Sequence, residues 1–190
     1  MRDTPGVAIG TFSPTGHIRA LPGDVPLAIK EHIMNLYVRN ANGYRVASVD
    51  EVVSTAKCAI NRKYRRGQAF TSPKMVEDYL RVKLSYEDNE KFVALWLDGR
   101  HRLIAYEELF QGTIDGTSVY PRVVVQKAIA HNAAAVIVAH PHPSGVAEPS
   151  AADENITRRL KQALELVDIR LLDHIVVGEQ CVSLAARGLL

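Results

Sequence analysis

Cysteine is scarce in this sequence. Only Cys58 and Cys181 occur among 190 residues, and they lie far apart without CxxC spacing. Such a pair supports neither a disulfide framework nor a cysteine-ligated zinc site, and it is typical of a reducing cytoplasm. Any metal bound by this chain is therefore expected to be held by histidine and carboxylate side chains.

Long apolar runs and a strong charge of one sign are also missing. No apolar stretch reaches the roughly 18 residues that a membrane span needs, and the polar start MRDTPG is not typical of a secretory signal. Lys and Arg number 23 against 21 Asp and Glu, which gives a net charge of +2. A charge this small does not by itself indicate a polyanionic partner. Together these absences predict a cytoplasmic protein with no membrane partner.

What is present divides the chain into two unequal parts. Residues 1–67 are rich in proline and glycine and show little sustained periodicity. One helix is predicted over residues 26–38, and another after Ser48, ending near Gly67. Ser48 followed three residues later by Glu51 is a capping-box pattern. We therefore expect a small, mostly helical N-terminal segment of unknown role.

The second of these helices ends in a basic run that contains Arg62, Lys63, Arg65 and Arg66, with Tyr64 among them. Four close cations attract phosphates, so the run is a candidate DNA site. Cations are also favoured at the negative C-terminal pole of a helix, in contact with solvent. The small net charge favours the solvated helix end, but both interpretations stay open.

Residues 68–190 alternate between strand and helix patterns. Continuous apolar runs predict buried strands at residues 92–97, 134–139 and 171–177, and residues 102–106 predict a strand that forms a hairpin with the first. Helices are predicted to begin after Ser72, at Pro121 and after Ser150. This order predicts a three-layer α/β/α domain with a mixed sheet.

The candidate chemistry lies in the segment HPHPSGVAEPSAAD, which directly follows a predicted strand. Side chains alternate along an extended segment, so His140 and His142 point to the same side while Pro141 faces away. Two imidazoles on one face can supply two ligands of a tetrahedral zinc ion. Asp153 can return to the same point because residues 143–145 turn the chain back, so it is the candidate third ligand.

A capped helix explains part of the same segment without a metal. Ser150 and Asp153 stand in the positions of a capping box, in which each satisfies a backbone group of the other. Capping does not explain why His140 and His142 lie side by side at a strand end, where they lose solvation and repel each other if protonated. The spacing alone supports the metal site and the capped helix about equally.

The segment resembles the signature of the JAMM (JAB/MPN) metalloprotease superfamily. His140-x-His142 is followed by seven residues, then Ser150, two further residues and Asp153. Within that superfamily, residues 70–190 resemble the RadC-like branch. The stretches that carry this resemblance are LDGRHRLIAYEELFQGTIDGTSVYPR, NAAAVIVAHPHPSG, PSAADENITRRL and LLDHIVVG.

The resemblance implies a JAB/MPN fold, which is similar to that of cytidine deaminases. The His/Cys-x-Glu and paired-cysteine signature of those enzymes is absent, so base deamination is not expected. The chain departs from the family at Pro141, where RadC-like proteins usually have Asn. Proline removes a backbone donor, so contacts with a substrate backbone are expected to change while the ligands stay intact. Residues 1–67 do not resemble the helix-hairpin-helix DNA-binding segment often found before this domain.

The resemblance implies a zinc-dependent hydrolase that cleaves amides, as a metallopeptidase or isopeptidase. Zn²⁺ is expected on His140, His142 and Asp153, with the fourth position left to a water whose pKa falls to about 7. Ser150 is expected to stabilise the oxyanion, and Glu90, which precedes the first strand, to act as general base. The alternative is a DNA-repair-associated accessory protein that binds DNA without peptidase turnover.

Other residues compete for these roles, or share them. Three glutamates are alternatives to Glu90 as the base, namely Glu107, Glu108 and Glu148. The first two are expected to be exposed or paired with Arg102, and the third to face solvent. The Ser150 hydroxyl has the competing role of a helix cap. His174, on the last predicted strand, is expected to be satisfied in the core or to support a ligand from behind, rather than to be a ligand itself.

Overall fold

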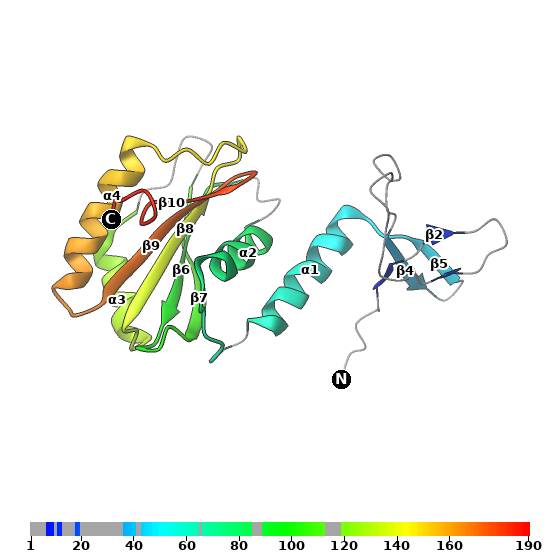
Figure 1. Cartoon of the computed structure of the whole chain (residues 1–190), viewed down its shortest axis with the longest axis horizontal. Coiled ribbons are helices and arrows are strands. Elements are labelled where there is room, and N and C mark those ends of the chain that lie inside the picture. Colours follow the sequence, from blue (N-terminus) through cyan, green and yellow to red (C-terminus); the bar gives the residue numbers. More distant parts are fainter. Residues whose placement is uncertain are drawn as a thin grey trace. The chain divides into compact units, whose positions relative to one another are not determined.

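The computed structural model describes residues 7–9, 11–12, 18–19, 36–40, 43–64, 66–84, 89–112 and 119–190. The chain forms two compact units, Met1–Cys58 and Ala59–Leu190, and the division between them lies within helix α1 (Val49–Lys63). Figure 1 shows the elements of both units. The domain boundary predicted at residue 67 stays a prediction.

Short strands make up most of the described part of the first unit. β1 (Val7–Ile9), β4 (Leu36–Asn40) and β5 (Gly43–Val46) form an antiparallel sheet in the order β1-β4-β5, and β2 (Thr11–Phe12) pairs with β3 (Ile18–Arg19). The prediction of a mostly helical segment is therefore wrong for these residues.

The predicted helix over residues 26–38 is wrong at its end, because Leu36, Tyr37 and Val38 lie in β4. Residues 26–35 lie outside the described part of the chain. Tyrosine and valine favour strands, and Asn42-Gly43 is a dipeptide typical of hairpin turns. Asn40 pairs with Gly43 across the two strands, so the pairing of β4 with β5 outweighs the weak helical pattern at residues 36–38.

The helix predicted after Ser48 is confirmed as α1. The backbone N–H of Ser48 donates to Glu51 Oε2 at 2.9 Å, and the backbone N–H of Glu51 donates to Ser48 Oγ at 3.3 Å. This reciprocal capping box satisfies two N–H groups that the first turn leaves without helical partners. The helix ends at Lys63, before Gly67, whose φ of +87° favours glycine.

A five-stranded mixed sheet forms the centre of the second unit (Figure 1), in the order β10-β9-β8-β6-β7. Its strands are β6 (Lys91–Leu97), β7 (Leu103–Gln111), β8 (Ala135–Pro141), β9 (Arg170–Val177) and β10 (Cys181–Ser183). β8 and β9 run parallel, and the other neighbours run antiparallel. The four predicted strands are confirmed, and β10 was missed because it is only three residues long.

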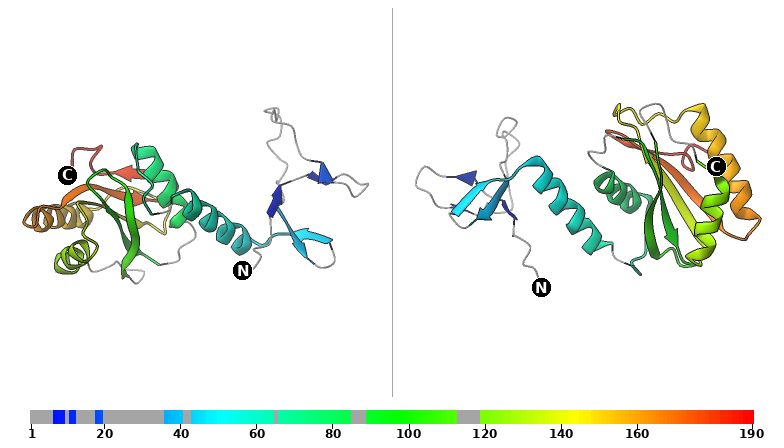
Figure 2. Two further views of the ribbon diagram at one scale, coloured as in Figure 1. Left: turned by 90° about the horizontal axis from the view of Figure 1, so that it is seen from below. Right: turned by 180° about the vertical axis from the view of Figure 1, so that it is seen from behind.

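Helices cover both faces of this sheet, with α2 (Pro73–Lys83) on one face and α3 (Pro121–Ala130) and α4 (Ala151–Glu165) on the other (Figure 2). Alternate side chains of β6 divide between the two layers, as the period of two in a strand requires. Val93, Leu95 and Leu97 join the core under α2, and Phe92, Ala94 and Trp96 join the core under α3 and α4. The predicted three-layer α/β/α domain is confirmed.

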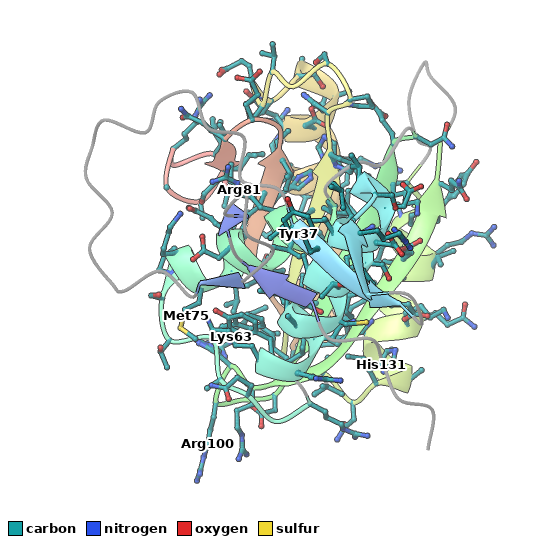
Figure 3. All side chains as sticks on the ribbon, turned by 90° about the vertical axis from the view of Figure 1, so that its right-hand side faces the viewer. Tyr37, Lys63, Met75, Arg81, Arg100 and His131 are labelled. Atoms are coloured by element: carbon teal, nitrogen blue, oxygen red, sulfur yellow. The ribbon has the colours of Figure 1, made fainter. Side chains whose placement is uncertain are left out.

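The turn between β6 and β7 lies where the Asp98-Gly99 pair predicts it. Asp98 Oδ1 accepts hydrogen bonds from the backbone N–H groups of Arg100 and Arg102 at 2.8 and 2.9 Å. Figure 3 shows the Arg100 side chain extending outward into solvent from this turn. None of the helices in the described parts of the chain combines the length and apolarity needed to cross a lipid bilayer.

Candidate metal centre

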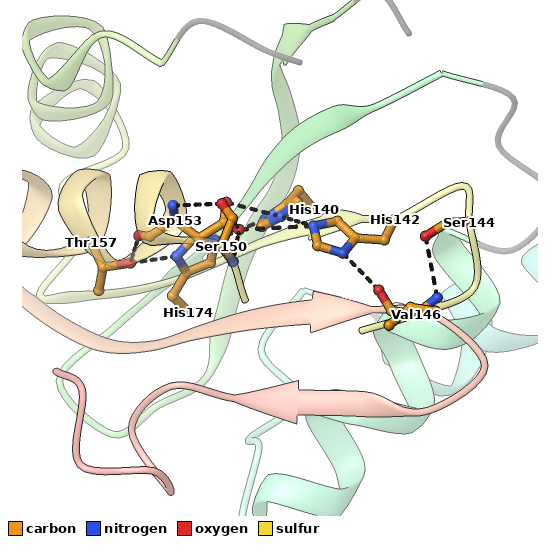
Figure 4. Close-up of polar contacts among 8 residues, drawn as sticks. All are labelled: His140, His142, Ser144, Val146, Ser150, Asp153, Thr157 and His174. Carbon is orange, nitrogen blue, oxygen red and sulfur yellow. Dashed lines mark hydrogen bonds and ion pairs between the residues drawn. The ribbon is translucent and has the colours of Figure 1, made fainter. Parts of the chain in front are cut away.

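β8 and α4 bring the three predicted ligands together (Figure 4). One ligand atom from each of His140, His142 and Asp153 lies within 4.8 Å of the others. His140 Nε2 is 3.1 Å from His142 Nε2 and 3.2 Å from Asp153 Oδ1, and His142 Nε2 is 3.8 Å from Asp153 Oδ2. The three side chains form a group able to hold a metal ion.

A tight turn after β8 returns the chain toward α4. The backbone N–H of His142 donates to Val177 O at 2.8 Å, which extends the pairing of β8 with β9 beyond the strand end. Gly145 then adopts a φ of +80°, a conformation that glycine adopts at little cost. Its carbonyl accepts from the backbone N–H of Glu179 at 2.8 Å. A Cβ atom at Gly178 would collide with that carbonyl oxygen, so two backbones meet here and hold the turn.

Burial and neighbouring polar groups together set the charge state of these three side chains. The His140 side chain is only 7% exposed, and burial, more than repulsion from His142, lowers its pKa to about 4 against the favourable charge of Asp153. Burial opposes ionisation of Asp153, but His140 and the hydrogen bonds from Ser150 hold the pKa of Asp153 below its usual value. At neutral pH the group therefore offers a neutral imidazole beside a carboxylate, the forms that bind metals.

Ser150 caps α4, as one of the two interpretations of the motif requires. Ser150 Oγ accepts from the backbone N–H of Asp153 at 3.2 Å, and the backbone N–H of Ser150 donates to Asp153 Oδ2 at 2.7 Å. The hydroxyl also donates to Oδ2 at 2.7 Å. Oδ1, the other carboxylate oxygen, faces His140. Oδ2 therefore accepts the hydrogen bonds of the cap, while Oδ1 faces the ligand group. Capping and metal binding are compatible for this carboxylate.

His174 lies behind His140 and outside the ligand group, as expected from the sequence. Its Nε2 is 2.9 Å from His140 Nδ1, and its Nδ1 is 2.6 Å from Thr157 Oγ1. His174 and Thr157 are both completely buried. Sequence reasoning missed Thr157. Its only signal is a spacing of four residues after Asp153, which places both residues on one face of α4.

Glu90 directly precedes β6, at the end of the sheet that carries the histidines. Val93 pairs with Ala139 in antiparallel register. The ring of Phe92, at the start of β6, stacks on the ring of His140 with centroids 6.3 Å apart. The placement agrees with a role near the metal group, and the role of Glu90 as general base stays a prediction.

Each of the three competing glutamates has a basic partner: Glu107 pairs with Lys127, Glu108 with Lys91 and Glu148 with Arg187. Glu148 is 66% exposed, so it faces solvent as predicted. Glu108 is exposed, as predicted. Glu107 is only 25% exposed and pairs with Lys127, so the prediction that it is exposed or paired with Arg102 is wrong. Arg102 instead binds Asp98 at 2.8 Å, because the tight turn brings these two side chains together.

Arg62, Lys63 and Arg66 of the basic run are exposed. Lys63 Nζ lies 5.0 Å from the centroid of the Tyr64 ring, a distance at which cation and ring attract each other. Arg65 lies outside the described residues. Exposure agrees with a solvated helix end and with a phosphate-binding patch alike, so DNA binding by this run stays a prediction.

The fold and the ligand group agree with a comparison against protein-family models, in which residues 70–189 match the RadC-like JAB domain. The chain belongs to the RadC-like JAB domain family. The predicted placement in the JAB/MPN superfamily is thereby confirmed.

Close relatives of this RadC-like chain are UPF0758 proteins of bacteria. Identity is 57% over 145 residues to the protein of Cellvibrio japonicus, covering 76% of this chain and 65% of the relative. It is 54% over 152 residues to that of Thioalkalivibrio sulfidiphilus, covering 80% and 68%. It is 61% over 127 residues to that of Nitrosococcus oceani, covering 66% and 57%. The chain thus matches about two thirds or less of each relative, and the name UPF0758 states no activity.

Proposed function

We propose that this RadC-like JAB domain is a zinc-dependent hydrolase that cleaves amide bonds of the peptide or isopeptide type. The observation that carries the proposal is the convergence of His140 Nε2, His142 Nε2 and Asp153 Oδ1. His142 Nδ1 lies 2.7 Å from Val146 O, and a carbonyl only accepts hydrogen bonds. The hydrogen of neutral His142 is therefore on Nδ1, and its Nε2 lone pair points at the other two atoms.

The chemistry of this donor set fits zinc. Two imidazole nitrogens and one carboxylate oxygen are ligands typical of a catalytic zinc ion, whereas a structural zinc is closed by four protein ligands. Among the residues that the structure describes, the group has three members, which leaves the fourth position to water. A zinc ion held there supplies an activated water at neutral pH.

The chain's own residues would then handle the proton and the developing charge. Glu90 is the proposed base that takes a proton from the water and passes it to the leaving amine, which balances the cleavage. Ser150 is the proposed donor to the oxyanion. Its hydroxyl hydrogen now points at Asp153 Oδ2, but the backbone N–H of Ser150 donates to the same oxygen. The hydroxyl can turn to a substrate while the backbone bond keeps Asp153 in place.

The first test is the zinc content of the purified protein beside the His142→Ala and Asp153→Ala variants. We expect near-stoichiometric zinc in the wild type and its loss in both variants. The second test is cleavage of a peptide library and of an isopeptide-linked conjugate, with Glu90→Gln as the inactive control. Bound zinc without cleavage of either substrate would contradict the hydrolase. Absence of zinc after the metal is offered would contradict the site itself.

A further inference from the structure

A series of four polar groups runs from the backbone of α4 to His140 of the metal group (Figure 4). Thr157 Oγ1 donates to the carbonyl oxygen of Asp153 at 2.6 Å and lies 2.6 Å from His174 Nδ1. His174 Nε2 lies 2.9 Å from His140 Nδ1. We call this series, from the Asp153 carbonyl through Thr157 and His174 to His140, the α4–His140 chain. It begins and ends at residues of the ligand group.

The Asp153 carbonyl fixes which group donates each hydrogen bond of the α4–His140 chain. The Asp153 carbonyl can only accept, so the single hydrogen of the Thr157 hydroxyl lies between these two oxygens. The equally short contact of Thr157 with His174 needs a second hydrogen, which His174 Nδ1 must supply. Thr157 therefore donates to the backbone and accepts from the ring.

The order of donors and acceptors continues from His174 to His140. Its ring is fully buried and lies edge-on to Phe92, with centroids 5.5 Å apart. A charge would lose its hydration there, so the ring is neutral. A neutral ring has one N–H. Because that N–H is on Nδ1, Nε2 accepts, and the hydrogen between the two rings belongs to His140 Nδ1.

The last step leaves His140 Nε2 with a lone pair, directed at His142 and Asp153. The reverse order would place a hydrogen on Nε2, which would then donate to Asp153 Oδ1 and close the ligand group to a metal. Reversal also requires the Thr157 hydroxyl to turn to His174, which leaves two oxygens 2.6 Å apart with no hydrogen between them.

We infer that Thr157 and His174 are positioning residues that hold His140 in the tautomer with a free Nε2. The inference rests on the proposed metal group but not on amide hydrolysis. Groups that orient a metal-ligating histidine typically contribute about 10- to 100-fold to metal affinity. Thr157 is expected to contribute in this range although its side chain touches neither imidazole of the ligand pair.

The test is the histidine tautomers of the metal-free full chain, read from long-range ¹H–¹⁵N spectra, together with the zinc affinity. In the wild type we expect N–H on Nδ1 of both His140 and His174. Thr157→Val keeps the side-chain shape and removes the hydroxyl, so His140 should shift toward the Nε2–H form and zinc affinity should fall about 10- to 100-fold. Thr157→Ser keeps the hydroxyl and should match the wild type in both readouts.

An Nε2–H tautomer of His140 in the metal-free wild type would overturn the inference, whatever the variants do. An unchanged tautomer and affinity in Thr157→Val would overturn it as well, and so would an equal loss in Thr157→Ser. A wild type with the expected tautomers that binds no zinc would support the α4–His140 chain and contradict the proposed function, so the two failures are distinguishable.

Discussion

Glu107 and Asp153 are both carboxylates that lie close to a histidine in the same domain. Glu107 Oε2 is 2.9 Å from His131 Nε2, and Asp153 Oδ1 is 3.2 Å from His140 Nε2. Glu107 also accepts from Lys127 Nζ at 2.5 Å and from the indole N–H of Trp96 at 3.1 Å. Burial opposes the ionisation of Glu107, but these hydrogen bonds hold its pKa below the usual value.

The two groups differ in where the hydrogens are. Each of these three neighbours of Glu107 can bring a hydrogen to the carboxylate, so that group is satisfied without a metal ion. Around Asp153 the nearest imidazole nitrogens present lone pairs, because the far nitrogen of each ring already carries the hydrogen. Distance between histidine and carboxylate is therefore a poor guide to a metal site. In the Asp153 group, the hydrogen-bond partner of the far ring nitrogen decides whether the near nitrogen presents a lone pair.

The largest effect should come from zinc itself. At a free zinc concentration of 1,000 times Kd, binding stabilises the folded state by about 4 kcal/mol. We expect this gain in the wild type and in His131→Ala, and its loss in His142→Ala. Urea unfolding with zinc and with a chelator measures it. A loss in His131→Ala as large as in His142→Ala would remove the distinction between the two groups.

The next largest effect should come from lowering the pH of the metal-free protein. His140 has a folded pKa of about 4, while an unfolded histidine titrates near 6.5. The unfolded chain therefore takes up a proton first, so the stability is fully present above pH 6.5 and falls as pH drops toward 4. One such group accounts for about 2 kcal/mol lost at pH 5, and His174 adds to the loss in the same direction.

Urea unfolding of the metal-free protein at pH 7 and pH 5 measures this slope. His140→Gln removes the titrating ring, and its amide can still hydrogen-bond to His174, so the slope should become shallower. An unchanged slope in His140→Gln would show that acid acts elsewhere.

The features predicted correctly from the sequence are those set by local pattern. The continuous apolar run at residues 92–97 predicts a strand that is buried on both faces of a sheet. The spacing from Ser150 to Asp153 predicts a capping box, which needs no tertiary contact. His140 and His142 were expected to meet because they share one face of an extended segment. Asp153 was added by the turn after His142 and by the family resemblance, and the role of all three as ligands stays a prediction.

Features that depend on contacts between distant elements were missed. Thr157 and His174 are 17 positions apart and meet only because α4 packs on β9. Arg102 binds Asp98 and not Glu107, because the geometry of the tight turn brings the Arg102 and Asp98 side chains together. In the first unit, the apolar pattern that predicts a helix up to residue 38 suits a strand equally well, and pairing with β1 and β5 makes residues 36–40 a strand.

A matched change tests the carboxylates directly, since Glu107→Gln and Asp153→Asn each replace one carboxylate oxygen by an amide nitrogen. Glu107→Gln weakens charged hydrogen bonds at a partly exposed site, so we expect a loss of about 1 kcal/mol in stability and no change in zinc content. Asp153→Asn should lose the zinc, because an amide is a poor zinc ligand. Equal zinc loss in both variants would contradict the comparison.

The smallest effect should separate the two roles of Ser150. Ser150→Ala removes an N-cap and should cost about 1 kcal/mol of stability, whereas glycine at an N-cap costs only about a few tenths. Both variants keep the backbone bond to Asp153 Oδ2, so both should retain zinc. If the hydroxyl stabilises the oxyanion, both lose turnover equally, about 100-fold or more, despite their different stabilities. If turnover instead follows stability, with Ser150→Gly close to the wild type, Ser150 acts only as a cap.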